Sequence, residues 1–209
     1  MGKRLIDISQ TLRPALPVWP GDTAFSLDQV WTIEPDCPVN VSRLTLSTHS
    51  GAHADAPLHY DPQGKAIAEV DPEIYIGTCH VFDVRKATNL VRPSDFNLEN
   101  AAGCKRILFR TFDRFPHDQW VSDYAAIAPD TIDALHHAGV KLVGMDGPSL
   151  DPETSKTLDA HHAVKRAGMA ILEGLVLDDV TEGRYELIAA PLKIEGADAS
   201  PVRALLREL

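Results

Sequence analysis

One stretch of eleven residues constrains this chain more than any other. From His49 to His59 it reads His-Ser-Gly-Ala-His-Ala-Asp-Ala-Pro-Leu-His, so three histidines and an aspartate are separated almost only by small residues and proline. Neutral imidazole nitrogens and carboxylate oxygens are the donors that bind divalent transition metals, most often zinc. A lone histidine would be read as a surface residue, but four donors in this pattern predict a metal site.

The spacing inside the stretch could suggest a helix, because His49 and His53 stand four residues apart. Against a helix, Gly51 lies between them, and Pro57 disfavours the helical conformation for the residue before it. The sequence therefore predicts extended chain with a tight loop.

The alternation of apolar and polar residues from Val41 to Thr48 predicts a strand that leads into His49. In extended chain His53 and Asp55 point the same way, and Gly51 lets the backbone fold His49 back towards them. Asp55 could then bind or bridge metals.

Length and composition predict one compact domain over residues 1–209, since 44% of the residues are hydrophobic. Strand patterns in runs with a few separate helices favour an α+β or β-rich α/β fold over a strict βαβ repeat. The expected helices cover residues 94–102 with Ser94 as N-cap, 130–138 capped by Asp130, and 156–166. Residues 200–209 are compatible with a short helix or an edge strand.

Charge and motif content argue against several function classes. The formal net charge is −10 and no basic run is present, which excludes nucleic acid and anionic membrane surfaces as expected partners. Three widely spaced cysteines predict no disulfide framework, and the absence of a leader-like or membrane-length apolar run makes the cytoplasm the expected compartment. No Gly-rich nucleotide motif is present.

Further metal ligands are expected downstream, because one loop cannot complete two coordination spheres. Glu173 lies in the apolar run Met-Ala-Ile-Leu-Glu-Gly-Leu, and a buried carboxylate must be paired or bound to a cation. The alternative is a strand-end carboxylate that reaches water past Gly174. Of the adjacent His161 and His162, one is expected to bind metal, and the spacing does not choose between them.

A proline-rich loop, residues 10–22, surrounds Trp19. An aromatic residue in such a loop either covers the core or forms the wall of a pocket. Residues 112–124 form a second expected loop, whose arginine and aromatic residues are either substrate contacts or solvated.

These residues carry a resemblance to a known family. The stretch from 49 to 59 is similar to the H-x-G-T-H-x-D-x-P-x-H signature of the cyclase-like metal-dependent hydrolases, except that Ala52 replaces the frequent threonine. The resemblance continues in residues 143–151 and in the pair His161 and Glu173. Nearly the whole chain resembles bacterial members that hydrolyse N-formyl-L-kynurenine to L-kynurenine and formate in tryptophan breakdown.

The resemblance implies a swivelling β/β/α fold, a homodimer, and two divalent cations per subunit, most often Zn²⁺. It implies one role for each matching residue: the first metal on His49, His53 and Asp55, the second on Asp55 and His161, Glu173 bridging, His59 as proton donor and acceptor, and Trp19 contacting the small-molecule substrate.

The chemistry is compatible with these residue types. Divalent cations lower the pKa of bound water and polarise carbonyl oxygens, so no Ser-His-Asp arrangement is needed. His59 could carry a proton from water to the leaving nitrogen. Two alternatives remain open: hydrolysis of another amide, cyclic imide or lactone by the same metals, or a non-catalytic metal-binding protein.

Overall fold

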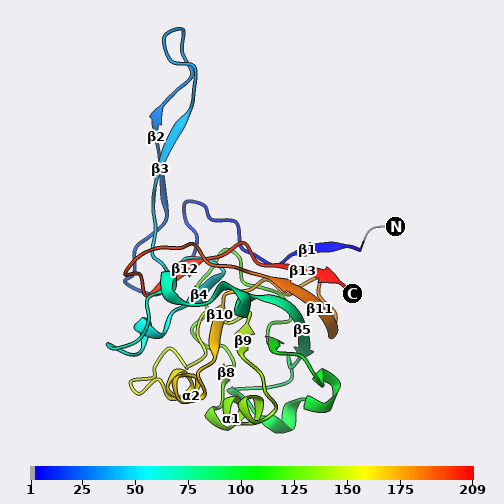
Figure 1. The fold of residues 1–209 in the computed structure, drawn as a ribbon. Helices are drawn as coiled ribbons and strands as arrows, with labels where there is room; N and C mark the ends of the chain where they lie inside the picture. Colours follow the sequence, from blue (N-terminus) through cyan, green and yellow to red (C-terminus); the bar gives the residue numbers. More distant parts are fainter. Residues whose placement is uncertain (1–2) are drawn as a thin grey trace.

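A computed structural model describes residues 3–209, and its main feature is a curled nine-stranded sheet in the order β1-β13-β11-β5-β7-β9-β10-β4-β12 (Figure 1). Its strands are β1 (Leu5–Asp7), β4 (His53–Asp55), β5 (Ile76–Asp83), β7 (Arg106–Arg110), β9 (Leu142–Met145), β10 (Ala170–Glu173), β11 (Gly183–Ile188), β12 (Ala199–Pro201) and β13 (Leu205–Glu208). Two further pairs lie outside it: β2 (Ser26–Trp31) with β3 (Val41–Thr45), and β6 (Leu90–Val91) with β8 (Ala126–Ile127).

The centre of the sheet is parallel and its sides are antiparallel. Strands β5, β7, β9 and β10 pair in parallel, whereas β11, β13, β4 and β12 pair antiparallel with their neighbours. Helices α1 (Pro129–His137) and α2 (Asp159–Ala167) lie side by side below the sheet in Figure 1. The prediction of a β-rich α/β fold with a few flanking helices is confirmed.

Each face of the sheet buries its own apolar cluster, because side chains alternate between the faces of a strand. One cluster packs the helices against the sheet and includes Phe82, Phe109, Ile132 and Val164. The other includes Val81 and Leu108, each next in sequence to a residue of the first cluster, together with Leu172, and is closed by the curled edge strands. The parallel strands are therefore buried on both sides, as is usual for such sheets.

All three expected helices differ from the structure, the third in that α2 begins at Asp159 rather than at residue 156. Residues 93–102 form two short 3₁₀ turns, η4 (Pro93–Asp95) and η5 (Leu98–Ala101), and Ser94 is not a cap. Helix α1 begins one residue earlier than expected, at Pro129, so Asp130 lies in its first turn and caps nothing. The other 3₁₀ turns are η1 (Pro57–His59), η2 (Ile67–Glu69) and η3 (Pro72–Tyr75).

The C-terminal residues form strands β12 and β13, which settles the choice between helix and strand left by the sequence. No helix within residues 3–209 combines the length and apolar character that crossing a membrane requires.

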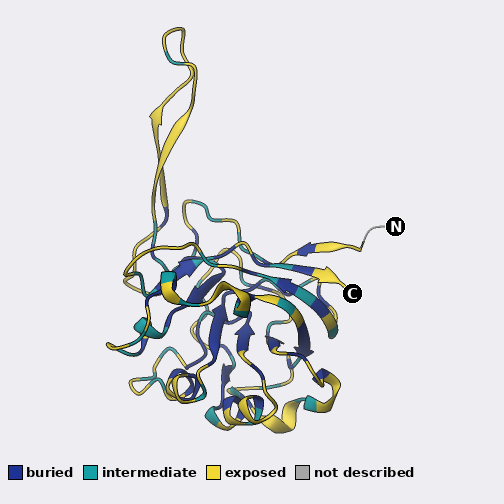
Figure 2. Ribbon diagram, viewed as in Figure 1, coloured by how far each residue is buried: buried dark blue, intermediate teal, exposed yellow. Residues whose placement is uncertain are grey.

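The hairpin of β2 and β3 projects away from the body of the molecule, at the top of Figure 1. Every residue of both strands is exposed, and Figure 2 shows the hairpin as almost continuously exposed chain. The predicted strand before His49 therefore exists, but it ends at Thr45 and belongs to this hairpin. It does not form the scaffold of the metal motif, because that scaffold is β4 in the main sheet.

Candidate metal centre

Strand β4, next to the edge strand β12, holds two of the predicted ligands. It runs between β10 and β12, so that His53 is opposite Glu173 and Asp55 is opposite Ile171. His53 and Asp55 are two residues apart and therefore face the same side of the strand. This pairing brings Glu173, which is distant in sequence, beside the first motif.

The turn before β4 brings His49 back over the strand, as the sequence predicts. Gly51 has φ +65°, a conformation that glycine adopts without strain. Gly174 has φ +64°, and a Cβ there would lie 2.6 Å from the carbonyl oxygen of Gly51. The two ligand-bearing segments can approach this closely only because residue 174 lacks a side chain.

Asp55 is the common neighbour of three imidazoles. Its Oδ1 lies 3.1 Å from Nδ1 of His49 and 3.5 Å from Nε2 of His53, and its Oδ2 lies 3.4 Å from Nε2 of His161. Glu173 lies 3.4 Å from the same nitrogen of His53 and 3.6 Å from that of His161. All five predicted ligands thus meet at one point.

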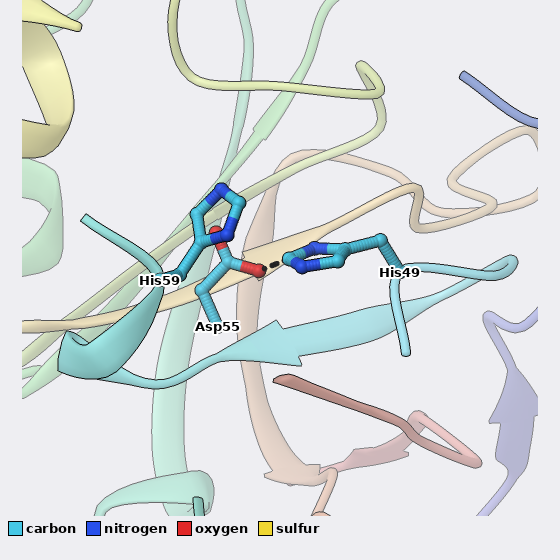
Figure 3. A group of neighbouring side chains, drawn as sticks. All are labelled: His49, Asp55 and His59. Atoms are coloured by element: carbon cyan, nitrogen blue, oxygen red, sulfur yellow. Dashed lines mark ion pairs between the residues drawn. The ribbon is translucent and has the colours of Figure 1, made fainter. Parts of the chain in front are cut away.

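His59 stands beside this group on η1, after the end of β4. Figure 3 shows its ring near the carboxylate of Asp55 and the ring of His49, with the His49–Asp55 ion pair dashed. The ring centroids of His49 and His59 are 4.3 Å apart. His59 is exposed while the other donors are buried or half-buried. It therefore lies between the cluster and solvent.

The donor atoms form two overlapping sets that share Asp55. Ligand atoms of His49, Asp55 and His59 lie within 4.8 Å of one another, and so do those of His53, Asp55 and Glu173. The first set contains His59, which the sequence reasoning placed outside the ligands.

Several donor atoms in the cluster are buried without a hydrogen-bond partner. Both carboxylate oxygens of Asp55 and Nε2 of His161 are in this state among the described residues. Leaving a buried carboxylate without hydrogen bonds is costly unless a cation compensates it. The donor set of imidazole and carboxylate suits a divalent metal such as zinc. The residues present therefore fit a metal centre.

The electrostatics of the cluster follow from its packing. Burial alone would raise the pKa of Asp55, but the imidazoles of His161 and His49 hold it well below its ordinary value. Burial would likewise lower the pKa of His49, yet Asp55 and Asp198 outweigh it and raise the pKa to about 9. For His161, Asp151 and Asp55 overcome burial and raise the pKa to about 10. Without metal, the imidazoles of His49 and His161 therefore favour their protonated forms and pair with the carboxylate of Asp55.

A cavity of about 390 Å³ opens onto the metal-ligand cluster. Its floor includes His49, His53, His59, His161 and Glu173, and its walls come mainly from the two loops that the sequence singled out. The loop of residues 10–22 contributes Pro17, Val18, Trp19 and Asp22, and that of residues 112–124 contributes Phe112, Phe115, Pro116, Gln119, Trp120 and Val121. The ring of Trp19 meets that of Trp120 edge-on at 5.4 Å. Trp19 is therefore a pocket wall rather than a cover on the core.

Comparison with known proteins places this geometry in a family. Residues 6–152 match the Cyclase family model, described as "Putative cyclase". The chain belongs to the cyclase family. Two curated members of similar length are called kynurenine formamidase: one from Maricaulis maris is 59% identical over 99% of both chains, and one from Erythrobacter litoralis is 53% identical over 99% of this chain and 95% of its own.

Solved structures with the cyclase-family fold agree with this assignment. A "predicted metal-dependent hydrolase" from Bacillus stearothermophilus is 28% identical, covers 100% of both chains and superposes with a TM-score of 0.85. Isatin hydrolase A from Labrenzia aggregata is 25% identical over 98% of this chain and 93% of its own, with a TM-score of 0.82.

The sequence analysis did not identify two aspartates that contact the histidines of the metal-ligand cluster. Asp151 accepts a hydrogen bond from Nδ1 of His161 at 2.6 Å. Asp198 lies 3.1 Å from Nε2 of His49 and 3.6 Å from Nδ1 of His59. Asp151 lies in the segment 143–151 that carried the family resemblance, but nothing in the sequence around Asp198 marks it.

The choice between the adjacent histidines is resolved by helix α2. His161 is buried and faces the metal-ligand cluster, whereas His162 is exposed. The alternative for Glu173 is also decided, since its side chain is buried and one of its oxygens accepts a hydrogen bond from the Leu150 amide at 2.7 Å.

Proposed function

We propose that this chain hydrolyses N-formyl-L-kynurenine to L-kynurenine and formate. The observation that carries the proposal is the buried carboxylate of Asp55, which has no hydrogen-bond partner among the described residues and lies against three imidazoles that line an aromatic-walled cavity. Two relatives more than 50% identical over nearly the whole chain are called kynurenine formamidase, which supports this substrate.

Two divalent cations, most reasonably Zn²⁺, are proposed to occupy the cluster. His49, His53 and Asp55 would hold one, Asp55 and His161 the other, and Glu173 would contact both. Asp55 belongs to both groups of closely spaced donor atoms, which supports its role as the shared ligand. When bound, divalent cations lower the pKa of water and polarise the carbonyl oxygen of a formamide.

The ligand rings are held in fixed tautomers by their outer contacts. Nδ1 of His53 donates to the carbonyl oxygen of Gly51 at 2.9 Å, since a carbonyl oxygen can only accept. Nδ1 of His161 donates in the same way to Asp151. In each ring this leaves Nε2 free to face Asp55 and Glu173, which is the arrangement that metal ligation by histidine requires.

His59 is proposed to move the proton that the reaction needs. In hydrolysis the oxygen of water bonds to the formyl carbon, the C–N bond breaks, and the aryl nitrogen gains a proton. The imidazole of His59 lines the cavity, so it can take the proton from water and return it to that nitrogen. Asp198, at 3.6 Å from Nδ1, orients the ring for this transfer.

Trp19 is proposed to stack on the aryl ring of the substrate. Its edge-on contact with Trp120 fixes its position, and the apolar residues of both loops exclude water from one side of the cavity. Aromatic pairs contribute about 0.5–1.5 kcal/mol beyond burial, which is enough to orient a ring.

A homodimer is proposed as the assembled form, in the cytoplasm. Seven large apolar side chains are exposed on the projecting hairpin and its tip, among them Trp31 at 57% and Leu44 at 56%; the others are Leu27, Val30, Ile33, Val39 and Val41. An isolated two-stranded hairpin is marginally stable in water, and exposed apolar patches of this kind mark interfaces. A second copy of the chain would cover them.

A turnover assay tests the proposed reaction. Protein loaded with zinc should release kynurenine from N-formyl-L-kynurenine, and a chelator should abolish turnover until zinc is restored. The matched isatin hydrolase favours one alternative, hydrolysis of a cyclic amide. Isatin, cyclic imides and simple aryl formamides should therefore be assayed in parallel. Preference for a cyclic substrate would overturn the proposal, as would full turnover by metal-free protein.

A further inference from the structure

A tight turn holds an aromatic ring and a carboxylate at the same rim of the cavity. The backbone amide of Asp22 donates to the carbonyl oxygen of Trp19 at 2.9 Å, and Gly21 between them has φ +90°. Proline followed by glycine with positive φ is typical of a type II turn. Both end residues of this turn, Trp19 and Asp22, line the cavity.

Among the carboxylates that line the cavity in the described chain, only Asp22 has no hydrogen bond or ion pair with a residue outside its own turn. Asp146 accepts hydrogen bonds from the amides of Thr111 and Phe112 and from the Thr111 hydroxyl. Glu173 lies in the metal-ligand cluster. Asp22 accepts only from the neighbouring amide of Thr23, within its own turn.

Away from the metal-ligand cluster, the cavity wall has no cationic side chain near Asp22 among the described lining residues. Neither lysine nor arginine lies among its lining residues within the described chain. An anionic group near the rim would therefore face Asp22 without compensation, whereas an ammonium group would be attracted to it.

We propose that Asp22 is a specificity-determining residue that pairs with the α-ammonium group of the substrate while Trp19 stacks on its aryl ring. The inference rests on the proposed function, because the class of substrate it specifies is an aryl formamide with an aminoalkyl tail. In such a molecule the ring centre and the ammonium nitrogen are about 6 Å apart by standard bond lengths. The ends of a β-turn are separated by less than about 7 Å, so one turn spans both groups.

The test removes the charge of Asp22 and keeps the turn. In Asp22→Asn the amide oxygen can still accept from Thr23, so the local hydrogen bond is retained. Three substrates are compared on the zinc-loaded protein: N-formyl-L-kynurenine, its decarboxylated analogue, and formanilide, which has neither charged group. Asp123→Asn is the matched control, because Asp123 is exposed in the neighbouring loop but does not line the cavity.

The expected result is a KM about two- to fivefold higher for the two ammonium substrates, with kcat unchanged, as for a partly exposed ion pair. KM for formanilide should stay constant. In the wild-type chain, added salt should raise KM for the ammonium substrates only, and in Asp22→Asn it should not. Asp123→Asn should behave as wild type. Equal losses on all three substrates, or none on any, would overturn the assignment.

Binding measurements separate this inference from the proposed function. Calorimetry with kynurenamine, which has the ring and the ammonium group but no formyl group, should show two- to fivefold weaker binding to Asp22→Asn than to wild type. Unchanged binding would overturn the role of Asp22. Absence of turnover with every formamide would instead contradict the proposed reaction, and the binding result would still decide the role of Asp22.

Discussion

Nδ1 of His161 donates a hydrogen bond of 2.6 Å to Oδ2 of Asp151, and the same carboxylate accepts from the backbone amides of Ala160 and His161 at 2.9 and 3.0 Å. One buried side chain thus satisfies the N-terminal amides of helix α2 and fixes the orientation of a proposed metal ligand. The position of the helix and the geometry of the site are coupled through Asp151.

Replacing this carboxylate should weaken metal binding more than it weakens the fold. Asp151→Asn leaves an acceptor for the helix amides but presents either an amide group or a neutral oxygen to His161. We expect zinc affinity to fall about 10- to 100-fold, measured by competition with a chromogenic chelator. Asp159→Asn, in the exposed first turn of the same helix, is the control and should keep full affinity.

His59→Ala should separate proton transfer from metal binding. Because the variant lacks the proposed proton carrier, kcat should fall by about 10²- to 10⁴-fold. The zinc content per chain should stay constant. Metal analysis of the purified variant checks this. Loss of zinc would show instead that His59 is a ligand, as its proximity to His49 and Asp55 permits.

Trp19→Ala should raise KM for N-formyl-L-kynurenine several-fold, because a stacking contact of about 1 kcal/mol is lost. Zinc content and the melting temperature should change little, since Trp19 is 37% exposed and lies at the cavity rim. Leu192→Ala, which removes a 61% exposed apolar side chain that does not line the cavity, is the control. Unaltered kinetics would leave Trp19 with a structural role only.

The metal-free protein should become less stable as the pH rises. The pKa of His49, about 9, lies above the ordinary value of 6.5 for histidine. Protonation of His49 therefore stabilises the fold fully below pH 6.5. This contribution, on the order of 1–3 kcal/mol, is lost as the pH rises through 9. Thermal unfolding between pH 6.5 and 9.5 in the presence of chelator measures it.

Two comparisons make the pH experiment specific. His49→Gln should make the decline smaller, the remainder coming from the raised pKa of His161, whereas His136→Gln on helix α1 should leave it unchanged. Zinc must displace the proton on His49, so zinc affinity should increase over the same pH range in which the metal-free protein loses stability. A metal-free protein whose stability is flat or rises between pH 6.5 and 9.5 would contradict this account.

The hairpin prediction concerns assembly. Trp31→Ser combined with Leu44→Ser should convert a dimer into a monomer, because both side chains are more than half exposed in the single chain. Sedimentation velocity of wild type and variant measures the mass. Lys105→Ser, remote from the hairpin and exposed, is the control. A monomeric wild-type chain would refute the proposed dimer.

The sequence was most informative where chemistry is local. The motif from His49 to Asp55 could be interpreted because donor type, glycine and extended-chain geometry all act within a few residues. Glu173 could be chosen because an acidic residue in an apolar run must be compensated. Both inferences agree with the positions of these side chains in the structure.

The predictions that failed depended on distant packing. The strand ending at Thr45 has the same alternation as a sheet strand, yet it forms a projecting hairpin, since alternation cannot say what covers the apolar side. Asp198 and Asp151 needed the tertiary fold, because an aspartate acquires its partner only when strands or helices from elsewhere meet it. His161 and His162 differ only in which side of helix α2 they occupy.

The pairing of β4 with both β10 and β12 has a consequence for biosynthesis. The ligands before residue 60 are made first, and Glu173 and Asp198, which lie beside them in the fold, are translated much later. A nascent polypeptide stalled before residue 170 would contain His49, His53 and Asp55 without the strands that enclose them. The proposed coordination shell can therefore close only after β10 and β12 have been translated, and shorter products would contain only part of it.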